Sequence, residues 1–182
     1  METIGHCLKE FGIIWRCLIR ADVLVGYGDD FVQMMADSGC VSVGMGIESG
    51  SPKILKNINK NQSVSTIKKA IRMLVDVGIK AKGFFILGLP GETQETINET
   101  RAFLEEMDLD DVDIKIYQPY PSTLIWENKD QYDIDWCDDL DYSKQFYKGR
   151  PEEYYGNIFT SALTNEQIRD EWISMEAKYK GM

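Results

Sequence analysis

The stretch "GMGIESGSPKILKNINKNQ", residues 44–62, decides the fold because it joins a strand to a helix through a short polar turn. The apolar run "VSVGMGI" predicts a buried strand, and "SPKILKNI" predicts a short helix. Between them, the turn offers a carboxylate at Glu48 and hydroxyls at Ser49 and Ser51. Parallel α/β sheets keep their ligands at such strand ends. Two interpretations stay open: the turn holds a ligand, or Ser49 or Ser51 caps the helix, with Pro52 in its first turn.

Helices and strands alternate on both sides of this stretch. Upstream, "ETIGHCLKEFG" predicts a helix, "IIWRCLI" a strand and "DDFVQMMADSG" a helix. Downstream, "SVSTIKKAIRMLVDVG", "IKAKGFFILGLPG", "ETQETINETRAFLEEMDL" and "DVDIKIYQPYP" predict helix, strand, helix and strand. The alternation predicts an α/β fold with four parallel strands, as an open sheet or part of a barrel. The continuous apolar run of residues 84–87 predicts a strand that is buried on both faces.

Composition narrows the class of protein. The 182 residues are 43% hydrophobic and 11% aromatic, which is enough for a folded core. The net charge of −10 argues against non-specific binding to nucleic acid or to an anionic membrane, because both need a basic face. No apolar run reaches the roughly 20 residues of a membrane span, and no signal peptide is visible, so the expected location is the cytoplasm.

The chain changes character after residue 123, so we expect two parts, 1–123 and 124–182. Residues 127–153 hold nine Asp or Glu against four Lys or Arg, with Tyr and Trp interleaved, which predicts an ordered acidic arm within 127–160. The sequence "LTNEQIRDEWISMEAKYK" predicts a final amphipathic helix, with Thr164 and Gln167 at capping-box spacing. The four cysteines show no CxxC or CxxxC spacing and are expected to be plain thiols.

Three predicted strands end in polar or glycine-rich loops: "GIESGS", "ILGLPGET" and "YQPYPST". Because the carboxyl ends of parallel strands share one edge, these loops are expected to converge. Gly88 and Gly91 would let the backbone approach a flat or bulky ligand. The alternative is that "GLPGET" is only a tight turn, with Thr93 as the cap of the next helix. The residues alone predict a small-molecule site on one edge of a parallel sheet.

The order and spacing of "GIESGS", "GFFILGLPGET" and "PYPST" closely resemble the second half of the radical S-adenosylmethionine (SAM) core, over roughly residues 13–123. The resemblance is strongest to the subfamily with a cobalamin-binding domain upstream. It implies the last four strands of a partial (β/α)6 barrel. It places Glu48 near the ribose of SAM and Lys60 near the methionine carboxylate, although relatives often have arginine there. The remaining cofactor-binding candidates are Arg20 at the methionine end, Ile86 and Tyr120 beside adenine, and Ser49, Ser51 and Gly88.

The sequence departs from this family at one decisive point, because the CxxxCxxC loop that holds the [4Fe–4S] cluster is absent. We therefore expect a truncated chain, with Met1 as an internal start, a boundary chosen in cloning or an artefact of gene prediction. We also expect that the parent protein binds SAM, a [4Fe–4S] cluster and, as a further candidate, cobalamin, and that this chain alone is inactive. An open sheet edge is expected to favour self-association. Two alternatives stay open: a cluster-less SAM-binding or partner module, and an unrelated barrel enzyme with Glu48 as general base.

Overall fold

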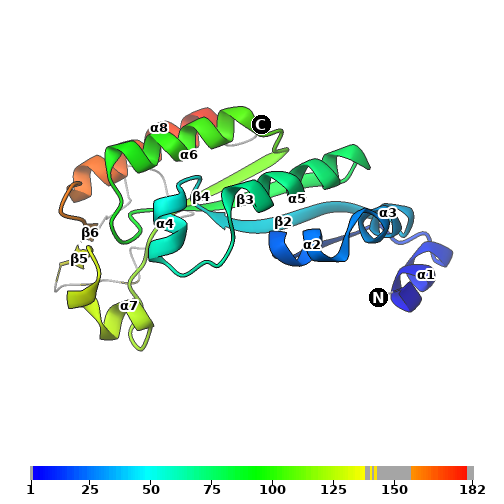
Figure 1. Cartoon of the computed structure of the whole chain (residues 1–182), viewed down its shortest axis with the longest axis horizontal. Coiled ribbons are helices and arrows are strands. Elements are labelled where there is room, and N and C mark those ends of the chain that lie inside the picture. The colour runs from blue at the N-terminus through cyan, green and yellow to red at the C-terminus, as the bar shows by residue number, and fades with distance from the viewer. Residues whose placement is uncertain (1, 138–139, 141, 143–156, 180–182) are drawn as a thin grey trace.

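The computed structural model describes residues 2–137, 140, 142 and 157–179. Four strands form one parallel sheet in the order β1-β2-β3-β4, and helices alternate with them (Figure 1). The strands are β1 (Trp15–Leu18), β2 (Cys40–Glu48), β3 (Lys80–Leu87) and β4 (Asp111–Ile116). The helices are α1 (Glu2–Glu10), α2 (Ala21–Tyr27), α3 (Asp29–Asp37), α4 (Pro52–Asn57), α5 (Val64–Asp76) and α6 (Gln94–Glu106). The predicted α/β fold with four parallel strands is therefore confirmed, while the short helix α2 was not predicted.

The remaining described elements follow β4. They are α7 (Leu124–Glu127), the 3-10 turn η1 (Lys129–Gln131), β5 (Asp135–Trp136), β6 (Ile158–Phe159) and α8 (Asn165–Tyr179). Strands β5 and β6 pair in antiparallel fashion. Figure 1 shows α7, β5 and β6 at the same end of the molecule as α4, which is the end where the strands of the large sheet finish. Much of the predicted acidic arm lies outside the described residues, and the boundary at residue 123 stays a prediction.

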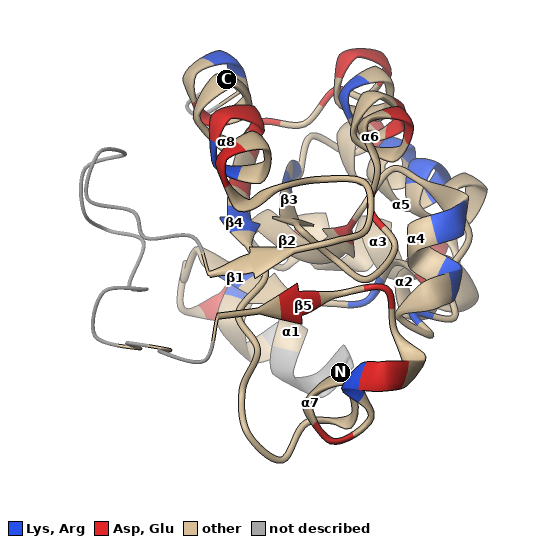
Figure 2. Cartoon of the chain, turned by 90° about the vertical axis from the view of Figure 1, so that its left-hand side faces the viewer, with Lys and Arg blue, Asp and Glu red and all other residues tan. Residues whose placement is uncertain are grey.

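Helix α8 packs against β4, at one edge of the sheet (Figure 2). The Trp172 indole N–H donates to the Ile114 carbonyl at 2.9 Å, and the Glu176 carboxylate accepts from the Ile114 N–H at 3.3 Å. These side chains satisfy backbone groups that an edge strand would otherwise leave unpaired. The predicted capping box at the start of α8 is confirmed, because Thr164 and Gln167 exchange both side-chain-to-backbone hydrogen bonds. The last helix therefore packs on the sheet.

The two faces of the sheet differ in burial. Along β3, Ala81, Phe85 and Leu87 are buried against the helices, whereas Phe84 and Ile86 on the other face are only half-buried. The prediction that this strand is buried on both faces is therefore wrong. The apolar side chains of β3 alternate between a face that helices cover and a face that stays partly accessible to solvent. We call the second one the open face; it carries Leu18 of β1, Gly44, Gly46 and Glu48 of β2, Lys82, Phe84 and Ile86 of β3, and Asp111, Asp113 and Lys115 of β4.

Strand β1 forms the other edge of the sheet, and no described strand pairs with its outer side. Apolar side chains cluster at this edge with large exposed fractions: 77% for Phe11, 75% for Ile14 and 76% for Leu18. The edge is short, at four residues. An accessible strand edge lined by apolar side chains is the feature that the self-association prediction needs.

A backbone constraint fixes how β2 begins. Gly39 has φ of +91°, and a Cβ built on it would lie 2.6 Å from the Ile13 carbonyl oxygen. Only glycine fits both the left-handed conformation and the close backbone approach. The Trp15 N–H donates to the Gly39 carbonyl at 3.0 Å, which sets β1 beside β2. Among the residues that the structure describes, no helix combines the length and apolar character needed to cross a membrane.

Candidate functional site

An ion pair stands at the carboxyl end of β2. The Lys60 ammonium lies 2.7 Å from Glu48 Oε1, and the two side chains are 16% and 19% exposed. Glu48 has a φ of +67°, a left-handed conformation that is unusual for a residue with a side chain. A Cβ on Gly46 would lie 2.6 Å from Glu48 Oε1 and 3.2 Å from Lys60 Nζ. The missing side chain of Gly46 is therefore what lets the pair lie over the end of β2.

Arg20 joins this pair from the end of β1. Its Nη2 is 3.4 Å from the Lys60 carbonyl oxygen and 3.0 Å from Asp22 Oδ2. The Asp22 carboxylate raises the pKa of Arg20, chiefly through their hydrogen bond. Arg20, Glu48 and Lys60, three of the predicted site residues, are thus brought together from two strand ends and the loop after α4. The Arg20 guanidinium is held by Asp22 and reaches the main chain of Lys60, while the Lys60 ammonium pairs with Glu48.

Ser49 and Ser51 are turned away from this cluster, and both are fully buried. The Ser49 hydroxyl hydrogen-bonds with Thr100 Oγ1 at 3.0 Å and accepts from the Ser51 N–H at 3.1 Å. Ser51 occupies the N-cap position of α4, but its side chain makes no capping hydrogen bond and its hydroxyl has no partner among the described residues. The side-chain capping interpretation is therefore wrong, while Pro52 at the start of α4 is confirmed. Ser49 fastens the turn to α6, and both serines are buried away from the open face.

The "GLPGET" turn is filled by protein. Gly88 has φ of +76°, and a Cβ on it would overlap the Ile158 side chain of β6. A Cβ on Gly91 would lie 2.5 Å from the Asn57 side-chain amide. The sequence analysis expected a ligand to approach the backbone beside these glycines. In the structure the side chains of Ile158 and Asn57 occupy that space. Thr93 caps α6 as the alternative predicted, in a reciprocal arrangement with Thr96.

Glu92 in the same turn was missed by the sequence analysis. It is fully buried; its Oε2 accepts a hydrogen bond from the Gly88 N–H, and its Oε1 has no partner among the residues described. Burial raises the pKa of Glu92 to about 8, and the N–H groups of Gly88 and Leu89 offset part of that effect. At neutral pH the side chain is therefore mostly the neutral acid. The sequence signal that could have pointed to Glu92 is its position four residues after Gly88, the glycine that follows β3.

Ile86 and Tyr120 lie in different surroundings. Ile86 is half-buried on the open face, and its register partner on β4 is Lys115. Tyr120 is 56% exposed and stacks on Tyr142, with ring centroids 5.7 Å apart. The structure records no contact between Tyr120 and the Glu48–Lys60 pair within its described part. Ile86 is on the open face, and the roles of Ile86 and Tyr120 beside adenine stay predictions.

A second charged group lies on the open face, and the sequence analysis did not find it. Lys82 Nζ lies 2.7 Å from Asp111 Oδ2 and 5.3 Å from the centre of the Phe84 ring. Asp113 and Lys115, two residues apart on β4, form a further ion pair. Alternation along β3 and β4 puts these side chains on one face, but no sequence pattern shows which face stays accessible.

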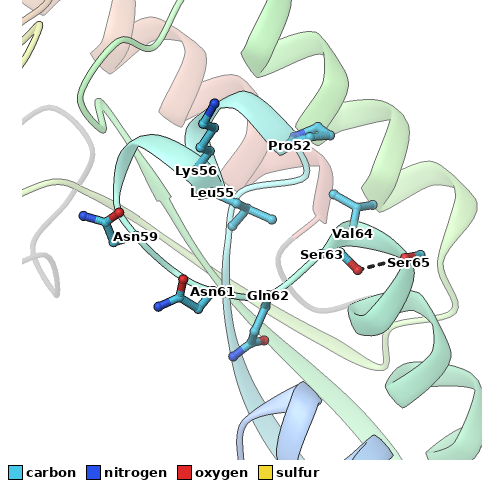
Figure 3. Close-up of a pocket in the computed structure, with 9 residues that line it drawn as sticks. All are labelled: Pro52, Leu55, Lys56, Asn59, Asn61, Gln62, Ser63, Val64 and Ser65. Carbon is cyan, nitrogen blue, oxygen red and sulfur yellow. Dashed lines mark hydrogen bonds between the residues drawn. The ribbon is translucent and has the colours of Figure 1, made fainter.

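A groove of about 590 Å³ lies behind the Lys60 loop, between α4 and the start of α5. Figure 3 shows Leu55 and Val64 inside it and the amide of Gln62 pointing away from both. Asn59 and Asn61, with φ of +51° and +54°, shape the loop that separates the groove from the ion pair. No three His, Cys, Asp or Glu side chains are grouped to hold a metal ion anywhere in residues 2–137, 140, 142 and 157–179.

A family model, the radical SAM superfamily, matches residues 6–104 of the chain. The chain belongs to the radical SAM superfamily. This assignment agrees with the parallel sheet and with the position of the Glu48–Lys60 pair at its carboxyl edge.

Curated relatives match this chain over a part of their own, longer sequences. An uncharacterized methyltransferase of Pyrococcus horikoshii is 37% identical over 126 residues, which is 66% of this chain and 26% of the relative. An anaerobic magnesium-protoporphyrin IX monomethyl ester cyclase of Rubrivivax gelatinosus is 29% identical over 128 residues, or 69% of this chain and 23% of the relative. The chain thus spans about a quarter of the length of these relatives.

Solved structures agree in fold. A radical SAM methyltransferase of Kitasatospora setae with cobalamin and a [4Fe–4S] cluster bound superposes with a TM-score of 0.61 at 16% identity, over 71% of this chain and 27% of that one. Coproporphyrinogen III oxidase of Escherichia coli, a radical SAM enzyme, superposes with a TM-score of 0.64 at 14% identity, over 98% of this chain and 37% of that one. Such identities support the shared radical SAM fold and nothing finer.

Proposed function

We propose that this chain forms the part of a radical SAM enzyme that holds the ribose and methionine ends of SAM. The enzyme as a whole would bind SAM and a [4Fe–4S] cluster and carry out methylation or a related functionalisation of a C–H bond. The observation that carries the proposal is the half-buried Glu48–Lys60 pair at the carboxyl edge of the sheet, in a chain of this superfamily.

The charges of the cluster fit the polar groups of SAM. A carboxylate such as Glu48 accepts hydrogen bonds from two neighbouring ribose hydroxyls, and charge assistance makes such bonds strong. The Lys60 ammonium suits the methionine carboxylate, and Arg20 stands next to it. The half-buried Ile86 offers an apolar surface on the same face for adenine. Gly46 leaves room at this end of β2, where any side chain would occupy the space of the pair.

The [4Fe–4S] cluster does not fit the residues described here. The sequence has no CxxxCxxC loop, and the described residues offer no group of three metal-binding side chains. The proposal therefore takes the cluster ligands from polypeptide outside this chain and expects no reductive cleavage of SAM by the chain alone. The names of the relatives, which include methyltransferases, a cyclase and methylthiotransferases, support radical methylation-type chemistry for the whole protein. Cobalamin, present in one structural neighbour, is a further cofactor candidate.

The experiment is a calorimetric titration of the full chain with SAM, paired with the variant Glu48→Gln. Binding that weakens at least tenfold in the variant is expected, because the neutral amide loses the charge-assisted hydrogen bonds to the ribose. Iron–sulfur reconstitution with visible absorbance is the companion measurement. Unchanged SAM affinity in Glu48→Gln, or a stoichiometric cluster on this chain alone, contradicts the proposal.

A second candidate is a SAM-binding or partner module that never acquires a cluster. The observation in its favour is the same lack of a ligand set among the described residues. Micromolar SAM affinity of the isolated chain, with no gain in affinity or activity when cluster-bearing extracts are added, would favour the module.

A further inference from the structure

Outside the Glu48–Lys60 pair, the open face carries two further ion pairs, and alternation along β1 and β3 adds the exposed cations Arg16 and Lys80. Lys82 pairs with Asp111 across β3 and β4, and Lys115 pairs with Asp113 along β4. The lysine side chains are 29% and 28% exposed, and the Asp113 side chain is 23% exposed. We call these four residues the charged wall. Arg16, at the amino end of β1, is exposed to solvent and stands apart from it.

The charged wall lies beside an apolar surface that Leu18 and Phe84 form over Gly44, which we call the floor. Gly44 of β2 is flanked in register by Leu18 of β1 and Lys82 of β3. A Cβ on Gly44 would lie 2.6 Å from Leu18 Cδ2 and 2.8 Å from Phe84 Cε2, so both side chains lean over this glycine. The Phe84 ring is half-buried, and the Leu18 side chain is 76% exposed. The open face therefore joins an aromatic and aliphatic surface to charges of both signs.

Three of the four wall residues lie closer to the amino ends of the strands than the proposed SAM cluster does. Parallel register aligns Gly46 with Phe84 and Phe84 with Asp113, and it aligns Gly44 with Lys82 and Lys82 with Asp111. Glu48 follows these residues at the carboxyl end of β2. Asp113 is thus one step, and Lys82 and Asp111 with the floor two steps, of the pleat toward the amino ends of the strands, whereas Lys115 aligns with Ile86 near the level of Glu48. A molecule on the floor would sit below the adenosyl group and in contact with different side chains.

The charge balance restricts what can bind there. A ligand with one net charge would draw one member out of a Lys–Asp pair and leave the other without compensation, which is costly for Lys82, Asp113 and Lys115 because each is less than a third exposed, and less so for Asp111, which is 48% exposed. A zwitterion can re-pair both members, because its carboxylate faces a lysine and its ammonium faces an aspartate. Lys82 of β3 pairs with Asp111 of β4, and Asp113 and Lys115 pair along β4. Positive and negative side chains therefore occur together within one patch. The apolar floor suits a flat or branched hydrocarbon body.

We propose that the open face binds a substrate with a zwitterionic, amino-acid-like head and an apolar body, and that Lys82, Asp111, Asp113 and Lys115 determine this specificity. The inference rests on the proposed function and names the substrate class of the same enzyme. Leu18 and Phe84 support the body of the substrate. The Glu48–Lys60 cluster takes no part in this selection.

The test uses three probes with one body and different charge: L-phenylalanine, phenethylamine and 3-phenylpropionate. Their dissociation constants for the full chain are measured by NMR titration at neutral pH. Phenylalanine is expected to bind at least tenfold more tightly than either singly charged probe. Lys82→Met, which leaves Asp111 without its partner, is expected to shift the ratio of affinities at least fivefold toward phenethylamine. Asp111→Asn is expected to shift it by a similar factor toward 3-phenylpropionate.

Lys68→Met is the matched control, because Lys68 pairs with Glu106 on the helices and not on the open face. It should leave all three constants unchanged. Absence of binding, equal binding of the three probes, or ratios that Lys82→Met and Asp111→Asn fail to move would overturn the inference. A parallel SAM titration reports on the proposed function separately. If SAM binds but the probes are not discriminated, only the proposed substrate class is contradicted. If the probes are discriminated but SAM does not bind, only the proposed SAM site is contradicted.

Discussion

Lys60 Nζ lies 2.7 Å from Glu48 Oε1, so the two residues assigned to opposite ends of one SAM molecule contact each other directly. Each is less than one-fifth exposed, and each therefore gains from an opposite charge nearby. A bound SAM molecule would place a ribose against the carboxylate and a carboxylate against the ammonium. Because these interactions compete with the ion pair, both residues must exchange partners as SAM binds.

The space over Gly46 tests this arrangement. Gly46→Ala introduces a methyl group at 2.6 Å from Glu48 Oε1 and 3.2 Å from Lys60 Nζ, so at least one of the two side chains must move. We expect SAM affinity to fall by about tenfold, measured by calorimetry, while circular dichroism shows a folded chain. The matched control is Gly26→Ala, because nothing lies within 4 Å of a Cβ there and the change adds helix propensity in α2. Equal SAM affinities of the two variants would show that the space over Gly46 does not matter for SAM binding.

Glu92 predicts how stability depends on pH. Its pKa is about 8 in the folded chain, against an ordinary value of 4.5. Below pH 4.5 both states bind the proton, so Glu92 adds no penalty. Between pH 4.5 and 8 the unfolded chain releases the proton while the folded chain keeps it, so the free energy of unfolding falls as pH rises. The full change is on the order of 5 kcal/mol and levels off above pH 8.

Glu92→Gln removes that titration while the amide oxygen can still accept from the Gly88 N–H. Urea unfolding at pH 5 and pH 8 should show a smaller loss of stability for this variant than for the unchanged chain. Glu99→Gln, at an exposed position of α6, is the control and should retain the full dependence. A steep pH dependence that survives in Glu92→Gln would assign the effect to another group.

The sequence predicted the fold well because its signals were local and periodic. Alternating apolar runs predicted four parallel strands, which the structure shows, while the SAM-binding roles that the resemblance gives Glu48, Lys60 and Arg20 stay predictions. The sequence could not show that Ile158, seventy residues away, fills the space beside Gly88. Such long-range packing has no periodic signature. The same holds for the burial of Ser49 against Thr100, which a polar turn in sequence gives no reason to expect.

Thr100 ties the turn after Glu48 to α6 and predicts a long-range effect on the site. Its Oγ1 accepts from the Gly50 N–H at 3.0 Å and shares a hydrogen bond of 3.0 Å with Ser49 Oγ. Thr100→Val keeps the shape of the side chain but leaves the buried Gly50 N–H without its acceptor and removes one of the two hydrogen bonds of Ser49 Oγ, at a cost of about 1–3 kcal/mol. Urea unfolding should show this loss. Thr66→Val, at the exposed start of α5, should cost less than half as much.

The free edge of β1 gives the last prediction. Leu18 and Ile14 are about three-quarters exposed beside a strand edge without a described partner, so two chains can pair there and bury both side chains. Light scattering after gel filtration should show a mass that rises with concentration. Leu18→Lys should shift the chain toward the monomer, because a charged side chain blocks such pairing. Val75→Lys changes an exposed apolar residue of α5 and should leave the mass unchanged. A monomer at every concentration, or equal effects of both lysines, would show that the edge does not associate.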